Sequence, residues 1–173
     1  MAGSVFICAD THIDHKRICE YRPQFKTVKE HNECIMDNLM SKLNKRTKLF
    51  ILGDAAFTLR GHEMLGKLPG FIHLIAGNHC TERGGCNMRE LARIYDRVDA
   101  AFSYGTGKNK FWLTHIPIHP MELRGKRNIH GHMHGKIIPD SNYINVSLEQ
   151  INYMPLDIEE ILNGNYRTFD VLS

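Results

Sequence analysis

Five apolar segments of the sequence are each followed by side chains that can bind a metal ion. These side chains belong to the blocks Asp10-Thr11-His12, Gly53-Asp54, Gly77-Asn78-His79, His115 and Gly131-His132-Met133-His134. Carboxylate oxygens, amide oxygens and imidazole nitrogens are ligands of hard and borderline divalent cations. Two residues separated by one position at a turn, such as Asp10 and His12, can both face one site. The glycines allow tight turns that direct the ligand groups inward. The spacing therefore predicts a metal site built from several loops.

Each of these residues has an ordinary structural explanation when it is taken alone. An aspartate after a strand, such as Asp10 or Asp54, is usually a helix N-cap. Asn78 is typical of a turn, and a lone His115 is more often a hydrogen-bonded core residue than a ligand. His132 and His134 could alternate along one strand. The combination decides for the metal site, because seven ligand-type residues after five successive strands would require five independent accidents.

In the first half of the chain, strands and helices are predicted to alternate in the order β-α-β-α-β. Apolar runs predict buried strands at Ser4–Ala9, Lys48–Leu52 and Phe71–Ala76. A helix is predicted over Thr27–Leu43, because Thr27 and Glu30 form a capping-box pattern before an apolar face. A second helix is predicted over Asn87–Tyr95. In α/β folds ligands collect at the carboxyl ends of strands, so the loops are expected to meet at one edge.

The second half of the chain is predicted to be mostly antiparallel β-structure. The strand-like segments are Val98–Tyr104, Lys110–Thr114, Asn128–Gly131, Gly135–Pro139, Tyr143–Val146 and Arg167–Leu172. The glycine-rich residues 105–109 between the first two segments indicate a hairpin. Asp157 is expected to cap a short helix, Ile158–Asn163.

Length and composition predict one globular domain. The chain has 173 residues, of which 42% are hydrophobic and 24% charged, values that disfavour disorder. No apolar run approaches the roughly 20 residues of a membrane span, and the apolar segment near the N-terminus is too short for a signal peptide. Five cysteines without a C-x-x-C pair argue against a disulfide framework and favour a cytoplasmic location. The net charge of +3 is modest for a nucleic-acid-binding protein.

The five blocks, in this order, resemble the calcineurin-like metallophosphoesterase superfamily, whose pattern is D-x-H, G-D, G-N-H, H and G-H-x-H. The stretch from Asp10 to Pro23 and the segment Leu52–Phe57 are similar to its compact bacterial and phage branch. The resemblance implies an α/β fold in which a two-sheet β-sandwich is flanked by helices, an αββα arrangement. It also implies that residues 1–173 form a single metallophosphoesterase domain.

The resemblance further implies a centre of two divalent metal ions. By the family pattern, Asp10, His12 and His134 bind the first ion, Asn78, His115 and His132 bind the second, and Asp54 bridges both. No block contains a thiolate; manganese is the expected metal, with iron, zinc and nickel as alternatives. Two such ions lower the pKa of a shared water, and the resulting hydroxide would attack phosphorus in line with the leaving group.

His79 matches the G-N-H histidine of the family, which contacts the phosphoryl group or protonates the leaving group. The aspartate that often follows this histidine is replaced here by Cys80, which removes the usual carboxylate partner. Cys80 itself is expected to be a spectator thiol. The expected substrate ligands are Asn78, His79, Arg83 and Arg124, with Arg22, Lys126 and Arg127 as further cationic candidates.

The predicted function is hydrolysis of small phosphodiesters or nucleotide-type substrates, because the compact branch has no large cap domain over its site. A nuclease of the same superfamily is the first alternative, disfavoured by the modest charge and the lack of an aromatic stacking strip in the sequence. A non-catalytic protein-binding scaffold is the second, disfavoured because all seven ligand positions are kept. The expected partner is a small phosphoester; nucleic acid is less favoured, no membrane is expected, and the oligomeric state stays open.

Overall fold

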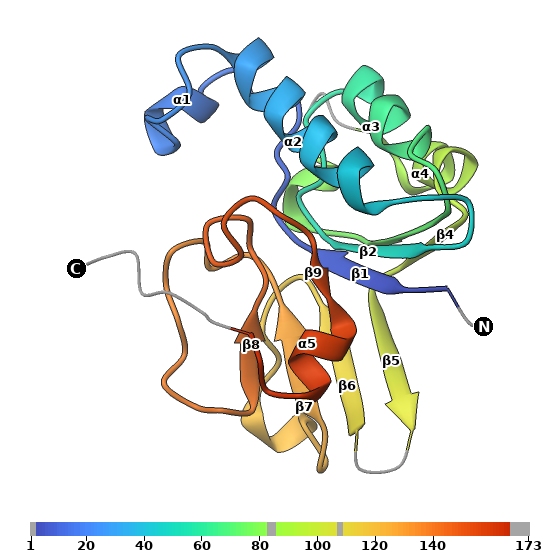
Figure 1. Cartoon of the computed structure of the whole chain (residues 1–173), viewed down its shortest axis with the longest axis vertical. Coiled ribbons are helices and arrows are strands. Elements are labelled where there is room, and N and C mark those ends of the chain that lie inside the picture. The colour runs from blue at the N-terminus through green and yellow to red at the C-terminus, as the bar shows by residue number, and fades with distance from the viewer. Residues whose placement is uncertain (1–2, 83–85, 107–108, 167–173) are drawn as a thin grey trace.

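The computed structural model describes residues 3–82, 86–106 and 109–166, which form two β-sheets with covering helices (Figure 1). The first sheet has the strand order β4-β3-β2-β1-β9. Its strands are β1 (Val5–Cys8), β2 (Lys48–Leu52), β3 (Phe71–Ile75), β4 (Arg97–Asp99) and β9 (Leu156–Asp157). Strands β1 to β4 are parallel, and β9 pairs antiparallel with β1. The first three strands lie within the segments predicted to be buried strands.

The second sheet has the strand order β5-β6-β7-β8 and is mostly parallel. Its strands are β5 (Ala101–Thr106), β6 (Asn109–Thr114), β7 (Arg127–His130) and β8 (Tyr143–Asn145). Within this sheet, only the β5–β6 pair is antiparallel among the described pairings. The prediction of a mostly antiparallel second half is therefore wrong. The connections over residues 115–126 and 131–142 are long enough to return the chain to the starting end of the sheet, which allows parallel pairing.

Two predicted strands of the second half are also corrected. The segment Val98–Tyr104 is not one strand, because β4 ends in the first sheet at Asp99 and β5 begins in the second at Ala101. Gly135–Pro139 is a loop without strand pairing, and its Ile137 is 38% exposed. The predicted strand Arg167–Leu172 lies outside the described residues.

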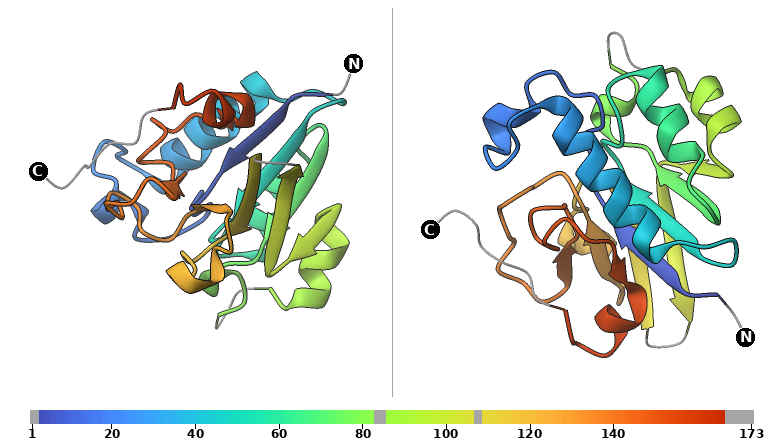
Figure 2. Two further views of the ribbon diagram at one scale, coloured as in Figure 1. Left: turned by 90° about the horizontal axis from the view of Figure 1, so that it is seen from below. Right: turned by 45° about the horizontal axis from the view of Figure 1, so that its top comes forward.

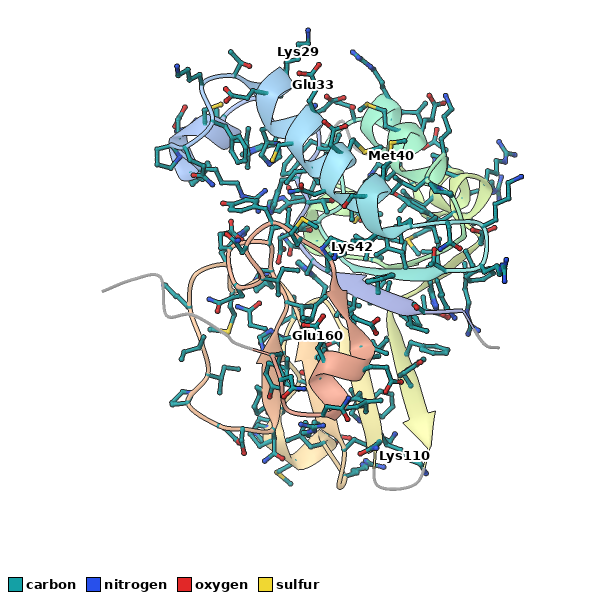
Figure 3. The ribbon with its side chains drawn as sticks, viewed as in Figure 1. Lys29, Glu33, Met40, Lys42, Lys110 and Glu160 are labelled. Carbon is teal, nitrogen blue, oxygen red and sulfur yellow. The ribbon has the colours of Figure 1, made fainter. Side chains whose placement is uncertain are left out.

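Helix α2 (Val28–Lys42) begins as the sequence predicts. The hydroxyl of Thr27 accepts a hydrogen bond from the Glu30 backbone N–H at 3.0 Å. Its outward face carries the exposed pair Lys29 and Glu33, whose charged groups are 3.6 Å apart (Figure 3). The other helices are α1 (Ile18–Tyr21), α3 (Leu59–Gly66), α4 (Met88–Ile94) and α5 (Ile158–Leu162), with short 3₁₀ turns η1 (Asn78–Cys80) and η2 (Pro120–Glu122). Among the helices described, none is long and apolar enough to cross a membrane.

Helices α1 and α3 were not expected from the sequence. Helix α3 contains Gly61 and Gly66, which lower its intrinsic helix propensity. It forms because Thr58 caps its first turn and because Leu65 is buried against the first sheet. Helix α1 is a single turn, too short to give a periodic apolar pattern.

Alternating side chains of the first sheet build two cores. Leu49 and Ile51 pack beneath the helices, whereas Phe50 and Leu52 pack between the two sheets. Helices α2, α3 and α4 cover the outer face of the first sheet, and the second sheet lies on its inner face (Figures 1 and 2). Helix α5 packs beside β1 and β9. The predicted α/β fold, with two sheets flanked by helices, is confirmed.

Candidate metal centre

The five predicted ligand loops all follow parallel strands. Three of them follow β1, β2 and β3 of the first sheet, and two follow β6 and β7 of the second. Backbone hydrogen bonds join neighbouring loops: Asp10 N–H donates to Gly53 O at 3.2 Å, and Gly131 N–H donates to His115 O at 3.0 Å. A bond from the His132 N–H to the Asp10 carboxylate, at 2.9 Å, links the loops of the two sheets. The loops therefore meet at one edge of the sandwich, as predicted.

Asp10, His12 and His134 form the first ligand cluster, with one ligand atom of each within 4.8 Å of the others. Asp10 Oδ2 accepts from the backbone of His132 and lies 2.6 Å from Ser147 Oγ. Asp10 Oδ1 is buried without a hydrogen-bond partner among the described residues, and so are both ring nitrogens of His12. Because unpaired buried polar atoms are costly, these free atoms fit a bound cation.

Asp54, His115 and His132 form the second ligand cluster, also within 4.8 Å of one another. His115 Nδ1 lies 2.9 Å from the carbonyl oxygen of Leu52, to which it can donate. Its Nε2 lies 2.9 Å from Asn78 Oδ1, 3.3 Å from Asp54 Oδ2 and 3.3 Å from His132 Nδ1. Burial acts to lower the pKa of His115, but the carboxylates of Asp54 and Asp10 raise it, so in the metal-free protein a proton on His115 lies among these acceptor atoms. A bound metal ion could replace that positive charge. The bridge from Asp54 to the first cluster stays a prediction.

The backbone of the ligand loops is strained in a way that serves these clusters. Five of the seven predicted ligands have a positive φ, namely Asp10 (58°), His12 (49°), Asp54 (44°), His132 (68°) and His134 (49°). This conformation costs a non-glycine residue about 1 kcal/mol or more and concentrates at functional sites. The neighbouring glycines are needed as well: a Cβ on Gly53 would lie 2.3 Å from the His115 ring, and one on Gly131 would lie 2.7 Å from Asp10 Oδ2.

Burial shifts the pKa values of two members of the first cluster. It raises the pKa of Asp10 and lowers the pKa of His12 well below its usual range. Burial also acts to raise the pKa of Asp54, but the hydrogen bond and charge of His115 outweigh it, and the pKa is lowered. Without a metal ion, ionisation of the buried Asp10 carboxyl group is therefore unfavourable, and a bound divalent cation would stabilise the ionised form.

Glu149 holds the ring of His134, the most exposed candidate ligand of the first cluster. Its Oε1 lies 3.1 Å from His134 Nδ1 and accepts from Arg22 Nε at 2.9 Å. Burial acts to raise the pKa of Glu149, but His134 and Arg22 lower it to about 2. Arg22, a candidate substrate cation, is instead 1% exposed and also donates to the backbone oxygen of Asp10 at 2.7 Å. A carboxylate behind a ligand histidine fixes its ring and raises its basicity.

We expect Glu149→Gln to weaken metal binding at the first cluster by about 10- to 100-fold, because the amide carries no charge to support His134. Metal content after equilibration at graded free Mn²⁺ measures the change. Glu160→Gln, at an exposed glutamate of α5, is the matched control and should bind metal like the parent protein. Unchanged metal binding in Glu149→Gln would contradict this supporting role.

Ser147 and Glu149 were missed in the sequence. Both follow β8, the third of the parallel strands β6, β7 and β8, so the strand-end argument applied to the other loops also applies there. Asn145, the last residue of β8, holds the loop that carries His134, because its Nδ2 donates to the His134 carbonyl oxygen at 2.9 Å.

His79 lies beside the second cluster without belonging to it. Its backbone N–H donates to Asp54 Oδ1 at 2.9 Å, and its Nε2 is 3.9 Å from Asp54 Oδ2. A carboxylate does lie beside His79, since Glu82 Oε2 is 2.6 Å from His79 Nδ1. Cys80 is buried, accepts from the Gly77 N–H at 3.4 Å, and has its pKa raised by burial. This environment suits a structural thiol rather than a nucleophile.

The remaining candidate substrate cations lie in different surroundings. Arg83 falls outside the described residues. Arg124 is exposed and pairs with Glu122 at 3.0 Å. Lys126 lies over the Trp112 ring at 3.7 Å, and Arg127 lies over the Phe111 ring at 4.8 Å. Substrate binding by Arg83 and Arg124 stays a prediction.

Two cavities adjoin the ligand clusters. The first, here named the α1 cavity, has a volume of about 620 Å³ and lies between α1 and the first cluster; its lining includes His15, Tyr21, Phe57 and His79. The second, the Met133 cavity, has a volume of about 590 Å³ and is lined by residues 116–117 and 132–136. His134 and Gly135 line both cavities, so the two cavities adjoin each other at His134.

No family model matches the chain. An alignment of 172 residues gives 30% identity with the uncharacterized protein MJ1445 of Methanocaldococcus jannaschii, covering 91% of this chain and 89% of that protein. A protein of unknown function from Aquifex aeolicus, AQ665, has the same fold, with a TM-score of 0.76 at 21% identity over 93% of this chain and 98% of its own. A point mutant of Vps29 from Entamoeba histolytica matches with a TM-score of 0.46 at 16% identity, over 84% of this chain and 75% of its own. Because the 30% identity extends over nearly the full length of both proteins, this chain belongs to the family of MJ1445.

Proposed function

We propose that this protein is a metal-dependent phosphoric ester hydrolase of the calcineurin-like kind, and that it acts on phosphodiesters. The main support is the convergence of two adjacent clusters of metal-ligand atoms on one edge of the sandwich. The buried, unpartnered Asp10 Oδ1 and His12 nitrogens, which lie within one cluster, also fit a bound cation.

The residues fit two divalent ions. Asp10, His12 and His134 would hold one, and Asn78, His115 and His132 would hold the other, with Asp54 between them. Bound there, the ions would lower the pKa of a water nucleophile and offset the charge on the phosphoryl oxygens. The mixture of oxygen and imidazole ligands suits manganese, with iron, zinc or nickel as alternatives.

The protein's own groups would position the ester. His79 lines the α1 cavity, where its side chain can reach a phosphoryl oxygen or a leaving oxygen, while Glu82 holds its Nδ1. The backbone N–H of His79 is already bonded to Asp54, which fixes the loop against the second cluster. A phosphodiester has two organic arms, and the α1 and Met133 cavities can accept one arm each. This pair of cavities favours diesters over monoesters.

Removal of metal should abolish hydrolysis. The protein is stripped with a chelator and assayed with bis(nitrophenyl) phosphate, nitrophenyl phosphate, cyclic nucleotides and single-stranded nucleic acid. We expect Mn²⁺ to be among the ions that restore activity, and the diester to be turned over faster than the monoester. Full activity in metal-free protein would contradict the metal-dependent mechanism, and faster turnover of the monoester would contradict the preference for diesters.

A further inference from the structure

The α1 cavity contains a row of rings that leads outward from the first cluster. Phe57 stacks at a centroid distance of 5.4 Å on His12, and its centroid is 4.3 Å from that of His15. His15 in turn stacks on Tyr21 at 5.8 Å. On the other side, Phe57 lies 5.1 Å from His79. The row therefore extends from a candidate metal ligand to the outer end of the cavity.

Tyr21 at the outer end of this row is not explained by packing in the core. It belongs to the single-turn helix α1 and is 65% exposed. Figure 1 shows α1 at one side of the molecule, next to the N-terminal end of α2. An exposed ring on the wall of a cavity beside a reactive centre is available to a ligand.

The charges of the cavity argue against a second phosphate in it. Among the described residues of its lining there is no lysine, and the arginine, Arg22, is engaged by Glu149 and by backbone oxygens. Glu149 contributes a carboxylate to the same wall. A diphosphate or triphosphate arm would lack the cations that such groups require. A neutral, planar group fits the aromatic lining better.

We infer that the α1 cavity binds a planar aromatic group of the substrate, a nucleobase or an aryl ring, by stacking on the exposed ring of Tyr21, with Phe57 as an inner aromatic wall of the cavity. This inference rests on the proposed function for the position of the phosphoryl group. It names the substrate class, a phosphodiester with a nucleoside or aryl arm. No aromatic strip is apparent in the sequence because the rings come from two distant segments: residues 15 and 21 lie before and in α1, whereas residue 57 follows β2.

The test is equilibrium binding of two probes to the Mn²⁺-supplemented protein. Adenosine 5′-monophosphate carries a base, and ribose 5-phosphate has the same phosphate without one. We expect the nucleotide to bind more tightly. We expect Tyr21→Ala to weaken nucleotide binding by about 5- to 150-fold, the range for loss of one stacking ring, and to leave ribose 5-phosphate binding unchanged. Tyr21→Phe should restore the affinity, since it keeps the ring.

Two further variants make the result specific. Phe57→Leu tests the inner ring in a similar volume and should also weaken nucleotide binding selectively. Phe71→Ala removes a partly exposed ring at the start of β3, the end of the strand opposite to the ligand loops, and should have no effect. Equal binding of the two probes to the parent protein, or an equal loss of both in Tyr21→Ala, would overturn the subsite. Failure of both probes to bind would also overturn it.

The same measurements separate the subsite from the proposed function. If the nucleotide binds selectively but no ester is hydrolysed, the subsite stands and the proposed hydrolase activity fails. If diesters are hydrolysed equally well with alkyl and aryl arms, the activity stands and the subsite fails. If an eight-residue oligonucleotide binds more tightly than a dinucleotide, the aromatic group in the cavity belongs to a nucleic acid. If the two bind with equal affinity, it belongs to a small nucleotide.

Discussion

Asp54→Asn is expected to remove most of the metal from the second cluster, to weaken binding at the first, and to lower hydrolysis by more than about 10³-fold. The Asp54 carboxylate is 3% exposed, and its Oδ2 faces His115 Nε2 at 3.3 Å. Asparagine has nearly the same shape, and its carbonyl can still accept the His79 N–H that now bonds to Oδ1. The change therefore removes charge and one acceptor while keeping the loop. Elemental analysis of the bound metal, together with a diesterase assay, measures both effects.

The matched comparison for Asp54→Asn is His12→Asn, which removes a ligand of the first cluster alone. This variant should lose close to one ion, whereas Asp54→Asn should affect both. Circular dichroism should show that both variants remain folded. If Asp54→Asn retains two ions and the parental rate, Asp54 does not bridge the clusters.

The local pattern of the sequence was sufficient for those elements whose signals are local. The apolar runs that became β1, β2 and β3 and the capped helices α2 and α4 lie where they were predicted, because burial and caps depend on residues within a few positions. Strand direction in the second sheet was predicted wrongly. Whether β6, β7 and β8 run parallel is decided by the path of the long connections, and no short pattern reports that path.

The candidate site likewise combines residues with a local sequence signal and residues that meet only in the folded chain. The candidate ligands could be selected from the sequence because each follows a buried strand by a few residues, and parallel strands bring their ends to one edge. Their supporting residues were not found. Glu149 meets Arg22 across 127 positions of the chain, and Tyr21 lines the same cavity as Phe57 only in the folded protein. Arg22 was one of several candidate substrate cations, because a sequence does not show whether a guanidinium is buried.

His79→Ala is expected to lower turnover by about 10²- to 10⁴-fold while both ions stay bound. The His79 side chain lines the α1 cavity and belongs to neither ligand cluster. Its Nε2, 3.9 Å from Asp54 Oδ2, lies close to the second cluster, while Nδ1 is held by Glu82 at 2.6 Å. This geometry suits a group that acts on the ester and is positioned by a carboxylate. Metal analysis and steady-state kinetics measure the two parts of the expectation, and loss of an ion would show that His79 is a ligand.

The leaving group distinguishes proton donation from charge stabilisation by His79. Nitrophenolate leaves without a proton, so a nitrophenyl ester should lose less activity in His79→Ala than an alkyl or nucleoside ester of the same phosphoryl group. Equal losses would mean that His79 stabilises phosphoryl charge instead. Glu82→Gln keeps an acceptor for Nδ1 and should be mild, whereas Glu82→Ala frees the ring and should reproduce part of the His79→Ala defect with the same dependence on the leaving group. A Glu82→Ala protein with parental kinetics on every ester would show that the 2.6 Å contact does not position His79 for the reaction.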